Sequence, residues 1–246
     1  MRLAICFGLL DTYVDKESAG LLDFFRGKSI PEKAGSPHGA LLWLTEGQNV
    51  VDLLKKSASL PVVSIIPFPD EQTHLAQYYC SIIQSHFPIT IPQDLSDCFP
   101  ARIAEGQYAL IHPGSGSPGK NYSPQFYRIL ATELRRHGFP ETGFIFGPVE
   151  DERMDAEDFA GERIEQPKDV EELADLLSGA SLYIGNDSGV SHLSGFMGTP
   201  TIALYKTTDP RKWGVLGKKV VHISDANEES AMHKIQECLS SWERVS

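Results

Sequence analysis

The sequence contains little cysteine and no closely spaced cysteine pair. Its four cysteines in 246 residues, Cys6, Cys80, Cys98 and Cys238, form no CxxC motif. Because zinc sites and disulfide frameworks need cysteines at short, regular spacing, both are disfavoured. Scattered free thiols are typical of a reducing compartment, so the sequence predicts a cytoplasmic chain.

Basic residues and long apolar runs are also scarce. The chain has 22 Lys and Arg against 33 Asp and Glu, a formal net charge of −11. A general nucleic-acid-binding face must be basic, so that partner class is disfavoured, although a local basic pocket remains open. No apolar run reaches the roughly 20 residues of a membrane-spanning helix. The N-terminal LAICFGLL is followed by Asp11, Asp15 and Glu17 in place of a small-residue cleavage site, which argues against a signal peptide.

From Tyr108 onward, strand and helix patterns alternate regularly. The expected strands are YALIH, GFIFG, SLYIGN, TIALY and KVVHI, and the expected helices are Pro124–His137, Val170–Ser178, Val190–Met197 and Glu228–Ser241. Such alternation predicts βαβ units in a mostly parallel sheet with helices on both faces.

The first hundred residues have a weaker pattern. The expected strands are LAICF, ALLWL and VVSIIPF, and the expected helices lie near Ser18–Arg26, Asn49–Ser57 and Glu71–His86. Pro88, Pro92 and Pro100 then indicate a linker. We therefore expect an α/β protein of two units, residues 1–100 and 101–246, of which the first is too short for a complete doubly wound domain.

The loop PGSGSPGKNYS follows the expected strand YALIH and nearly fits two phosphate-binding motifs. Asn121 stands where a nucleotide phosphate loop has a hydroxyl, and Pro118 interrupts the glycines of a dinucleotide fingerprint, so neither motif is complete. Backbone N–H groups at glycines together with Lys120 still suit an oxyanion. The alternative is a flexible turn with a solvated lysine.

A second loop, NDSGVSH, ends the strand SLYIG and turns directly into a helix. Asp187 or Ser188 is the expected cap, Gly189 allows close approach, and His192 lies about one turn into the helix. Free N–H groups and a partial positive charge at a helix start suit a diphosphate. The alternative is that Asp187 is only a cap and His192 only a core residue.

A third loop, YKTTDPRKW, follows the strand TIALY and carries Thr207, Thr208 and Asp209. Ligands of open parallel sheets bind beyond the carboxyl ends of the strands, so we expect all three loops to converge at one edge. Taken alone, this segment also fits an Asp-Pro turn followed by exposed basic residues.

The ordered set IHPGSGSPGKNYSPQFYRIL, FGPVEDE, YIGNDSGVSHLSGFMGTPTIALY and TTDP resembles glycosyltransferase family 9, the lipopolysaccharide heptosyltransferases. The resemblance implies a GT-B-like fold of two Rossmann-like parallel-sheet domains, of which the N-terminal one is incomplete here. It also implies an inverting mechanism without a catalytic metal or other cofactor. The implied donor is a nucleotide-diphosphate sugar, ADP-heptose in the best-known members.

The resemblance also implies roles for particular residues. Those expected to hold donor phosphate or sugar are Ser115, Gly116, Lys120, Asp187, Ser188, Gly189 and His192, and Thr208 and Asp209 complete the expected binding set. Glu150 is expected near the nucleoside.

Two departures from the family pattern affect the interpretation. Lys206 and Thr207 replace the usual Gly-Pro, so Lys206 either contacts phosphate or points to water. The family's N-terminal Gly-Asp, source of its proposed catalytic aspartate, has no counterpart, which leaves Asp11 as a stand-in base. In the other interpretation, the chain starts midway through the first domain and Asp11 only caps or decorates a loop.

The leading hypothesis is therefore a transferase that moves a heptose-like sugar to a lipid-linked or lipopolysaccharide-core saccharide at the inner face of the cytoplasmic membrane. We expect no nucleic-acid partner. We expect peripheral contact with the membrane and no transmembrane segment. The alternative is a non-catalytic nucleotide-sugar-binding protein. A third reading, a phosphate-loop NTPase with Lys120 and Asp187 as its motifs, predicts magnesium-dependent hydrolysis.

Overall fold

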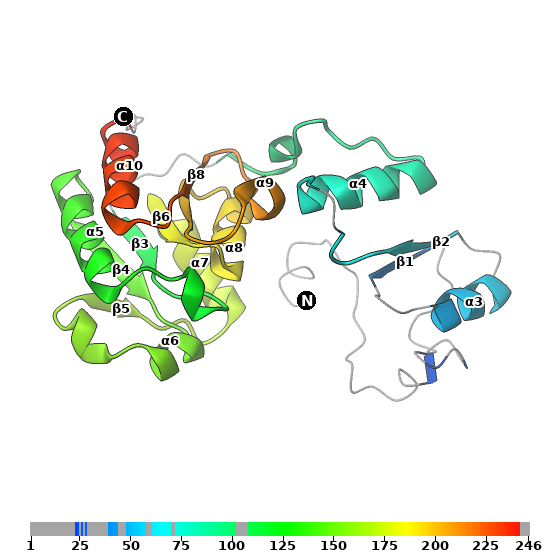
Figure 1. The fold of residues 1–246 in the computed structure, drawn as a ribbon, viewed down its shortest axis with the longest axis horizontal. Helices are drawn as coiled ribbons and strands as arrows, with labels where there is room; N and C mark the ends of the chain where they lie inside the picture. Colours follow the sequence, from blue (N-terminus) through cyan, green and yellow to red (C-terminus); the bar gives the residue numbers. More distant parts are fainter. Residues whose placement is uncertain are drawn as a thin grey trace. The chain divides into compact units, whose positions relative to one another are not determined.

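The computed structural model describes residues 23, 24, 26, 28, 39–43, 48–57, 61–69, 72–101 and 108–241. The chain divides into two compact units, Met1–Ile91 and Pro92–Ser246 (Figure 1). The division lies within the proline-containing stretch that the sequence marks as a linker. The expected α/β fold with parallel sheets is confirmed.

In the first unit, two parallel strands, β1 (Ala40–Trp43) and β2 (Val62–Ile65), are joined through helix α3 (Gln48–Ser57). Val50, Val51 and Leu54 of α3 pack with Leu42 in a small buried cluster. The expected strand LAICF and most of the expected helix near residues 18–26 lie outside the described residues.

Helix α4 (Leu75–His86) follows β2 and begins four residues later than the sequence pattern suggests. His74 caps it, because its Nδ1 accepts a hydrogen bond from the N–H of Ala76 at 3.2 Å. Residues 71–73 are Glu-Gln-Thr and carry no apolar residue, so no periodic signal fixes a helix start upstream of Leu75. A short 3₁₀ turn, η2 (Leu95–Cys98), lies in the second unit.

The second unit is built on a six-stranded parallel sheet in the order β5-β4-β3-β6-β7-β8 (Figure 1). The strands are β3 (Tyr108–His112), β4 (Glu141–Ile145), β5 (Arg163–Glu165), β6 (Leu182–Asn186), β7 (Thr201–Tyr205) and β8 (Val220–Ser224). The chain runs outward from β3 to one edge, returns, and runs outward from β6 to the other. This is the doubly wound order of nucleotide-binding folds, and it makes the β3–β6 boundary the point where strand order reverses.

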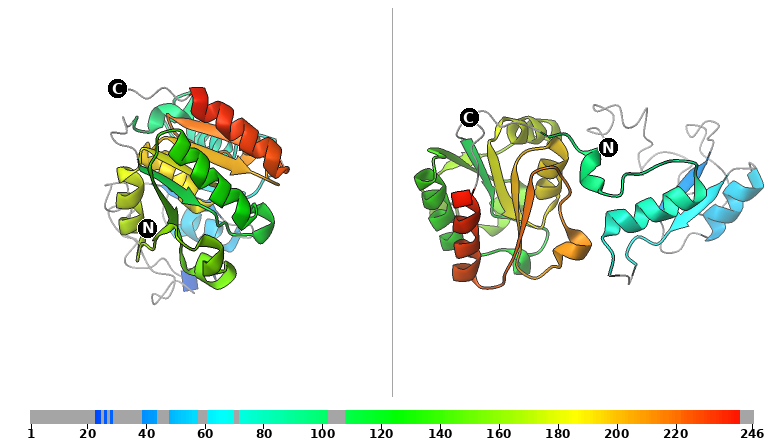
Figure 2. Two further views of the ribbon diagram at one scale, coloured as in Figure 1. Left: turned by 90° about the vertical axis from the view of Figure 1, so that its left-hand side faces the viewer. Right: turned by 90° about the horizontal axis from the view of Figure 1, so that it is seen from above.

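Helices cover both faces of this sheet (Figures 1 and 2). Helices α5 (Pro124–Arg136) and α10 (Glu228–Ser241) lie side by side on one face, where they bury aromatic and aliphatic side chains against the strands. Helices α7 (Val170–Gly179) and α8 (Gly189–Met197) contribute to a second buried cluster with Leu110, Ile145 and Tyr183. All four helices start and end within one residue of the expected positions.

Shorter elements were not expected from the sequence. They are η3 (Pro118–Lys120), α6 (Pro148–Arg153), η4 (Ala156–Phe159), α9 (Pro210–Trp213) and the edge strand β5. Strand β5 has three residues and a single apolar one, Ile164, so its alternation is too short to recognise. Strand β4 also begins two residues before the expected GFIFG run, because its polar start pairs with β3.

Helix α8 packs closely against the segment that precedes β8, and Gly195 makes this packing possible. A Cβ atom at Gly195 would lie 2.3 Å from the carbonyl oxygen of Leu216 and 2.6 Å from Cγ1 of Val215. Both distances are far inside van der Waals contact, and the nearer atom belongs to the backbone. The absence of a side chain therefore sets the position of α8 beneath the candidate site.

We predict that Gly195→Ala lowers the free energy of unfolding by about 1–3 kcal/mol, since overpacking outweighs the gain in helix propensity. Urea denaturation followed by circular dichroism measures this change. Gly179→Ala is the matched control, because a Cβ there meets no atom within 4 Å, and it should leave stability unchanged or slightly raised. Equal stability of the two variants would show that α8 is not closely packed at Gly195.

Candidate functional site

The candidate site lies at the carboxyl edge of the sheet, where β3 and β6 are neighbours. These strands pair in parallel with His112 opposite Gly185, so the loops that follow them start side by side. The glycine-rich loop, residues 113–123, leaves β3, and Asp187 and Ser188 connect β6 to α8. Loops at such a reversal point form the ligand crevice of doubly wound sheets.

The two loops meet at Asp187. Lys120 Nζ donates a hydrogen bond to Asp187 Oδ2 at 2.7 Å, and His192 Nε2 lies 3.9 Å from Asp187 Oδ1. The carboxylate is 8% exposed, whereas the lysine and histidine side chains are 30% and 47% exposed. The structure therefore brings Lys120 and His192 to one buried carboxylate, with the ammonium group and the imidazole both accessible to solvent.

Asp187 carries a fixed negative charge. Burial by itself raises its pKa, but the neighbouring His192, Lys120 and Thr208 outweigh burial and lower the pKa to about 2. The carboxylate is therefore ionised at neutral pH and orients Lys120 before any ligand arrives.

The start of α8 adds backbone donors to this charge cluster. Ser188 is the cap, and its Oγ accepts a hydrogen bond from the N–H of Ser191 at 3.4 Å. Gly189 is the first helical residue and is exposed, with nothing within 4 Å of a Cβ built on it. The first N–H groups of a helix have no partner within the helix, and they carry the positive end of its dipole.

Asn186 ties the glycine-rich loop to the end of β6. It is fully buried, and its Nδ2 donates to the carbonyl oxygens of Pro113 and Gly114 at 2.8 and 3.3 Å and to Asn121 Oδ1 at 3.2 Å. Its Oδ1 accepts from the Tyr127 hydroxyl at 2.9 Å. Sequence reasoning missed this residue, although an asparagine that ends an otherwise apolar strand is a recognisable signal.

Ser115 and Gly116 occupy different positions within the loop. Ser115 is 5% exposed, and its Oγ lies 2.6 Å from Asn121 Oδ1 and 2.7 Å from the carbonyl oxygen of Ser117. The Ser115 hydroxyl therefore donates within the loop. Gly116 is exposed. The expected ligand contact of Ser115 remains a prediction, and it requires this hydroxyl to leave its present partners.

Glu150 lies at the start of α6, behind the glycine-rich loop. It is 6% exposed, its Oε2 accepts from the N–H of Gly147 at 2.9 Å, and its Oε1 lies 3.5 Å from His112 Nε2. A Cβ at Gly114 would come within 1.7 Å of Oε1, so only glycine allows this approach. Burial raises the pKa of Glu150, but His112 and backbone N–H groups lower it by more. The net pKa therefore lies below the ordinary value of a glutamate.

His112, which sequence reasoning did not select, connects Glu150 to the cap of α8. The imidazole is 5% exposed, and its Nδ1 lies 3.4 Å from Ser188 Oγ. The recognisable signal was a histidine ending an apolar strand directly before the glycine-rich loop.

The third loop contributes Thr208 to the cluster. Thr208 helps to lower the pKa of Asp187, yet its buried Oγ1 has no partner at hydrogen-bonding geometry among the described residues. Asp209 instead caps α9 and holds the guanidinium of Arg211 at 2.6 Å. An open pocket of about 410 Å³ lies here, lined by Thr207, Thr208, Asp209, Pro210, Arg211 and Ser224.

Lys206, the departure from the family pattern, points to the glycine-rich loop. Its Nζ donates to the carbonyl oxygen of Asn121 at 2.8 Å and lies 5.4 Å from the centre of the Tyr122 ring. It therefore links the end of β7 to the loop that carries Lys120.

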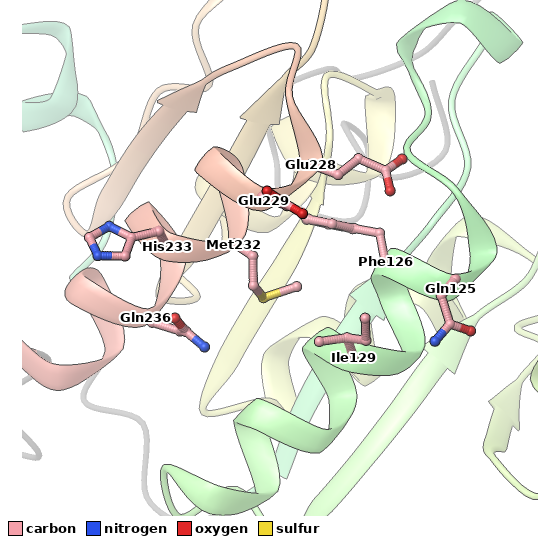
Figure 3. A pocket seen from close by; sticks show the side chains of 8 residues that line it. All are labelled: Gln125, Phe126, Ile129, Glu228, Glu229, Met232, His233 and Gln236. Atoms are coloured by element: carbon pink, nitrogen blue, oxygen red, sulfur yellow. The ribbon is translucent and has the colours of Figure 1, made fainter.

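A second hollow, between α5 and α10, has a different character (Figure 3). Its volume is about 380 Å³, and its lining residues are Gln125, Phe126, Ile129, Glu228, Glu229, Met232, His233 and Gln236. Two of these are acidic and none is Lys or Arg, so the hollow does not suit a diphosphate.

Among the described residues, no three His, Cys, Asp or Glu side chains come together in a way that could hold a metal ion. No helix that the structure describes is long and apolar enough to cross a membrane. Asp11, the expected base, lies outside the described residues.

Comparison with known proteins gives concordant results. The chain is 29% identical over 153 residues to lipopolysaccharide heptosyltransferase 1 of Escherichia coli O18:K1:H7 (strain RS218 / NMEC), a match to 61% of this chain and 44% of that protein. The chain thus spans less than half the length of this relative.

Solved structures with the same fold include the E. coli heptosyltransferase WaaC with ADP, at a TM-score of 0.63 and 20% identity over 90% of this chain and 79% of that one. They also include E. coli ADP-heptose lps heptosyltransferase II, at a TM-score of 0.58 and 18% identity, with 85% of this chain and 72% of that one covered. The model of glycosyltransferase family 9 (heptosyltransferase) matches residues 71–243. Since this match covers well over half of the sequence, the chain belongs to glycosyltransferase family 9.

Proposed function

We propose that this chain binds a nucleotide-diphosphate sugar at the candidate site and transfers a heptose-like sugar to a cell-envelope saccharide. The observation that carries the proposal is the meeting of Lys120 and His192 at Asp187, beside the start of α8. Membership of family 9 supports the reaction class.

The charges of the site suit a diphosphate with a sugar attached. Lys120, the first N–H groups of α8 and His192 in its protonated form all favour phosphate oxygens. Asp187 repels phosphate, but its carboxylate can accept hydrogen bonds from sugar hydroxyls. A ligand with an anionic part and a hydroxyl-rich part therefore satisfies both kinds of group, whereas a bare phosphate satisfies only one.

The same groups suit catalysis of sugar transfer. As the bond to the sugar breaks, negative charge builds on the leaving diphosphate, and fixed donors aimed at that charge lower the barrier. In our proposal the protein supplies this stabilisation without a metal, and the configuration at the sugar carbon inverts in a single displacement. A carboxylate takes the proton of the acceptor hydroxyl, and Asp11 is the candidate for that base.

The names of the relatives suggest the substrates. A solved structure of similar fold is called an ADP-heptose lps heptosyltransferase, and the curated relative is a lipopolysaccharide heptosyltransferase. We extend ADP-heptose as donor and a lipid-linked or lipopolysaccharide-core saccharide as acceptor to this chain. Residues 101–246 then form the donor domain and residues 1–100 the acceptor side, at the cytoplasmic face of the membrane with peripheral contact. In this proposal Glu150 lies near the nucleoside, and Ser115 and Gly116 hold donor phosphate or sugar.

We predict that Lys120→Ala weakens ADP-heptose binding tenfold or more, because a charge-assisted hydrogen bond is lost and Asp187 loses its neutralising partner. Calorimetry measures the affinity, and circular dichroism checks that the variant is folded. His192→Ala should change affinity in the same direction.

Lys168→Ala is the matched control, since it also removes a lysine paired with a carboxylate, Glu172, but on an exposed surface. Its affinity should equal that of the wild type. Equal affinity of the Lys120 and Lys168 variants would remove the candidate site from consideration.

We also predict that transfer continues in excess EDTA and gives a product of inverted anomeric configuration, as read by NMR of the saccharide. Asp11→Asn should reduce kcat a hundredfold or more, in line with the usual contribution of a general base. Loss of transfer in EDTA, or retention of configuration, would contradict the mechanism. Donor binding without transfer to any lipid saccharide would favour the non-catalytic alternative.

A further inference from the structure

A chain of buried polar side chains runs behind the candidate site, from Glu150 through His112 to Ser188. Glu150 Oε1 lies 3.5 Å from His112 Nε2, and His112 Nδ1 lies 3.4 Å from Ser188 Oγ. Glu150 and His112 are 6% and 5% exposed, so water does not readily replace either contact. The proposed donor site does not by itself require an ionisable ring at this buried position.

The contacts determine where the protons lie before a ligand binds. Glu150 is ionised, because His112 and the N–H of Gly147 lower its pKa in spite of burial. The carboxylate can only accept, so His112 Nε2 carries the proton that faces it. In a neutral imidazole the other nitrogen is then an acceptor. Ser188 consequently donates its hydroxyl proton to His112 Nδ1, while its oxygen caps the N–H of Ser191.

The Ser188 hydroxyl is therefore turned away from the ligand in this state. Besides His112, the Ser188 Oγ has the hydroxyl of Ser191 as a neighbour, 3.4 Å away. Ser191 itself donates to the carbonyl oxygen of Asn186 and, in turn, accepts from the hydroxyl of Tyr183 at 3.0 Å. If His112 gained a second proton, both ring nitrogens would donate and Ser188 Oγ would accept. The serine proton would then be released to donate toward the pocket.

We propose that His112 is a positioning residue that takes up a proton from solvent when the diphosphate binds, which turns the Ser188 hydroxyl toward a phosphate oxygen. The added proton resides on Nδ1, and no covalent bond forms or breaks. The inference rests on the proposed donor site and adds to it a coupling between donor binding and protonation. Histidine suits this role, because its charge changes readily near neutral pH.

The surrounding charges favour this coupling. Glu150 from α6 faces the ring and stabilises its cationic form, and Tyr183 from β6 stays neutral since burial raises its pKa. Asp187, at the end of β6, adds a further negative charge to the same edge. Lys120 opposes protonation of His112 in the empty site. A bound diphosphate neutralises this ammonium group, which removes that opposition in the complex.

The test is calorimetry of ADP-heptose binding near pH 7.5 in buffers with different ionisation enthalpies, which gives the protons taken up per ligand. A nucleotide sugar is the required probe, because each of its two phosphates is substituted twice, by one ester and the shared anhydride, and does not titrate near neutrality. We expect proton uptake by the wild type and loss of roughly half or more of it in His112→Asn. We also expect affinity of this variant to fall about tenfold to a hundredfold, the value of one hydrogen bond to a charged group.

Matched variants distinguish proton uptake by His112 from proton uptake by other histidines. His192→Asn removes the exposed histidine of the site and should leave the contribution of His112 in place. His233→Asn removes an exposed histidine of α10, which is paired with Glu237, and should change neither uptake nor affinity. Ser188→Ala removes the acceptor of the new hydrogen bond and should reduce uptake even if the His112 variant fails to fold.

The outcomes are distinct. Binding with no proton uptake, or with uptake unchanged in His112→Asn and Ser188→Ala, would overturn this proposal and leave the donor site intact. Absence of ADP-heptose binding by the wild type would overturn the proposed function and this coupling together. Nitrogen NMR of the wild-type imidazole offers an independent check, since Nδ1 should gain a proton in the complex and not in the free protein.

Discussion

The ion pair between Lys120 and Asp187 joins two loops whose contacting residues are 67 positions apart in the sequence. The remainder of the candidate site depends on it. The pair holds the glycine-rich loop against the start of α8, so that the ammonium group of Lys120 and the backbone donors of the helix face the same space. A carboxylate that is 8% exposed would be costly without this partner. A bound anion can therefore take over the hydrogen bond from Lys120 only if another group, such as a sugar hydroxyl, donates a hydrogen bond to Asp187 in its place.

Much of the second unit could be predicted because its signals are local. Buried parallel strands give continuous apolar runs, and the start of α5 combines a serine cap with proline at the first helical position. The convergence of the three loops follows from the rule that parallel strands end at one edge of a sheet. The positions of Lys120, Asp187 and His192 could be inferred for the same reason, since each lies in the loop or helix start that follows a recognisable strand.

Other features could not be predicted because they arise from contacts between distant segments. Asn186 and His112 stand out in the sequence only as polar residues that end apolar strands. Their partners, Asn121 and Glu150, are known only from the folded chain. The family resemblance implies a ligand contact for Ser115, but hydrogen bonding within the loop engages its hydroxyl. Strand β5 owes its existence to pairing with β4, since its own three residues have little strand pattern.

The central claim is that the glycine-rich loop and the start of α8 together form one diphosphate site. A structure of the chain in complex with ADP-heptose tests it most directly. The account predicts phosphate oxygens about 3 Å from Lys120 Nζ and from the first backbone N–H groups of α8, with the sugar toward Asp187. A diphosphate bound elsewhere in the molecule, with the Lys120–Asp187 pair undisturbed and distant from it, would contradict the account.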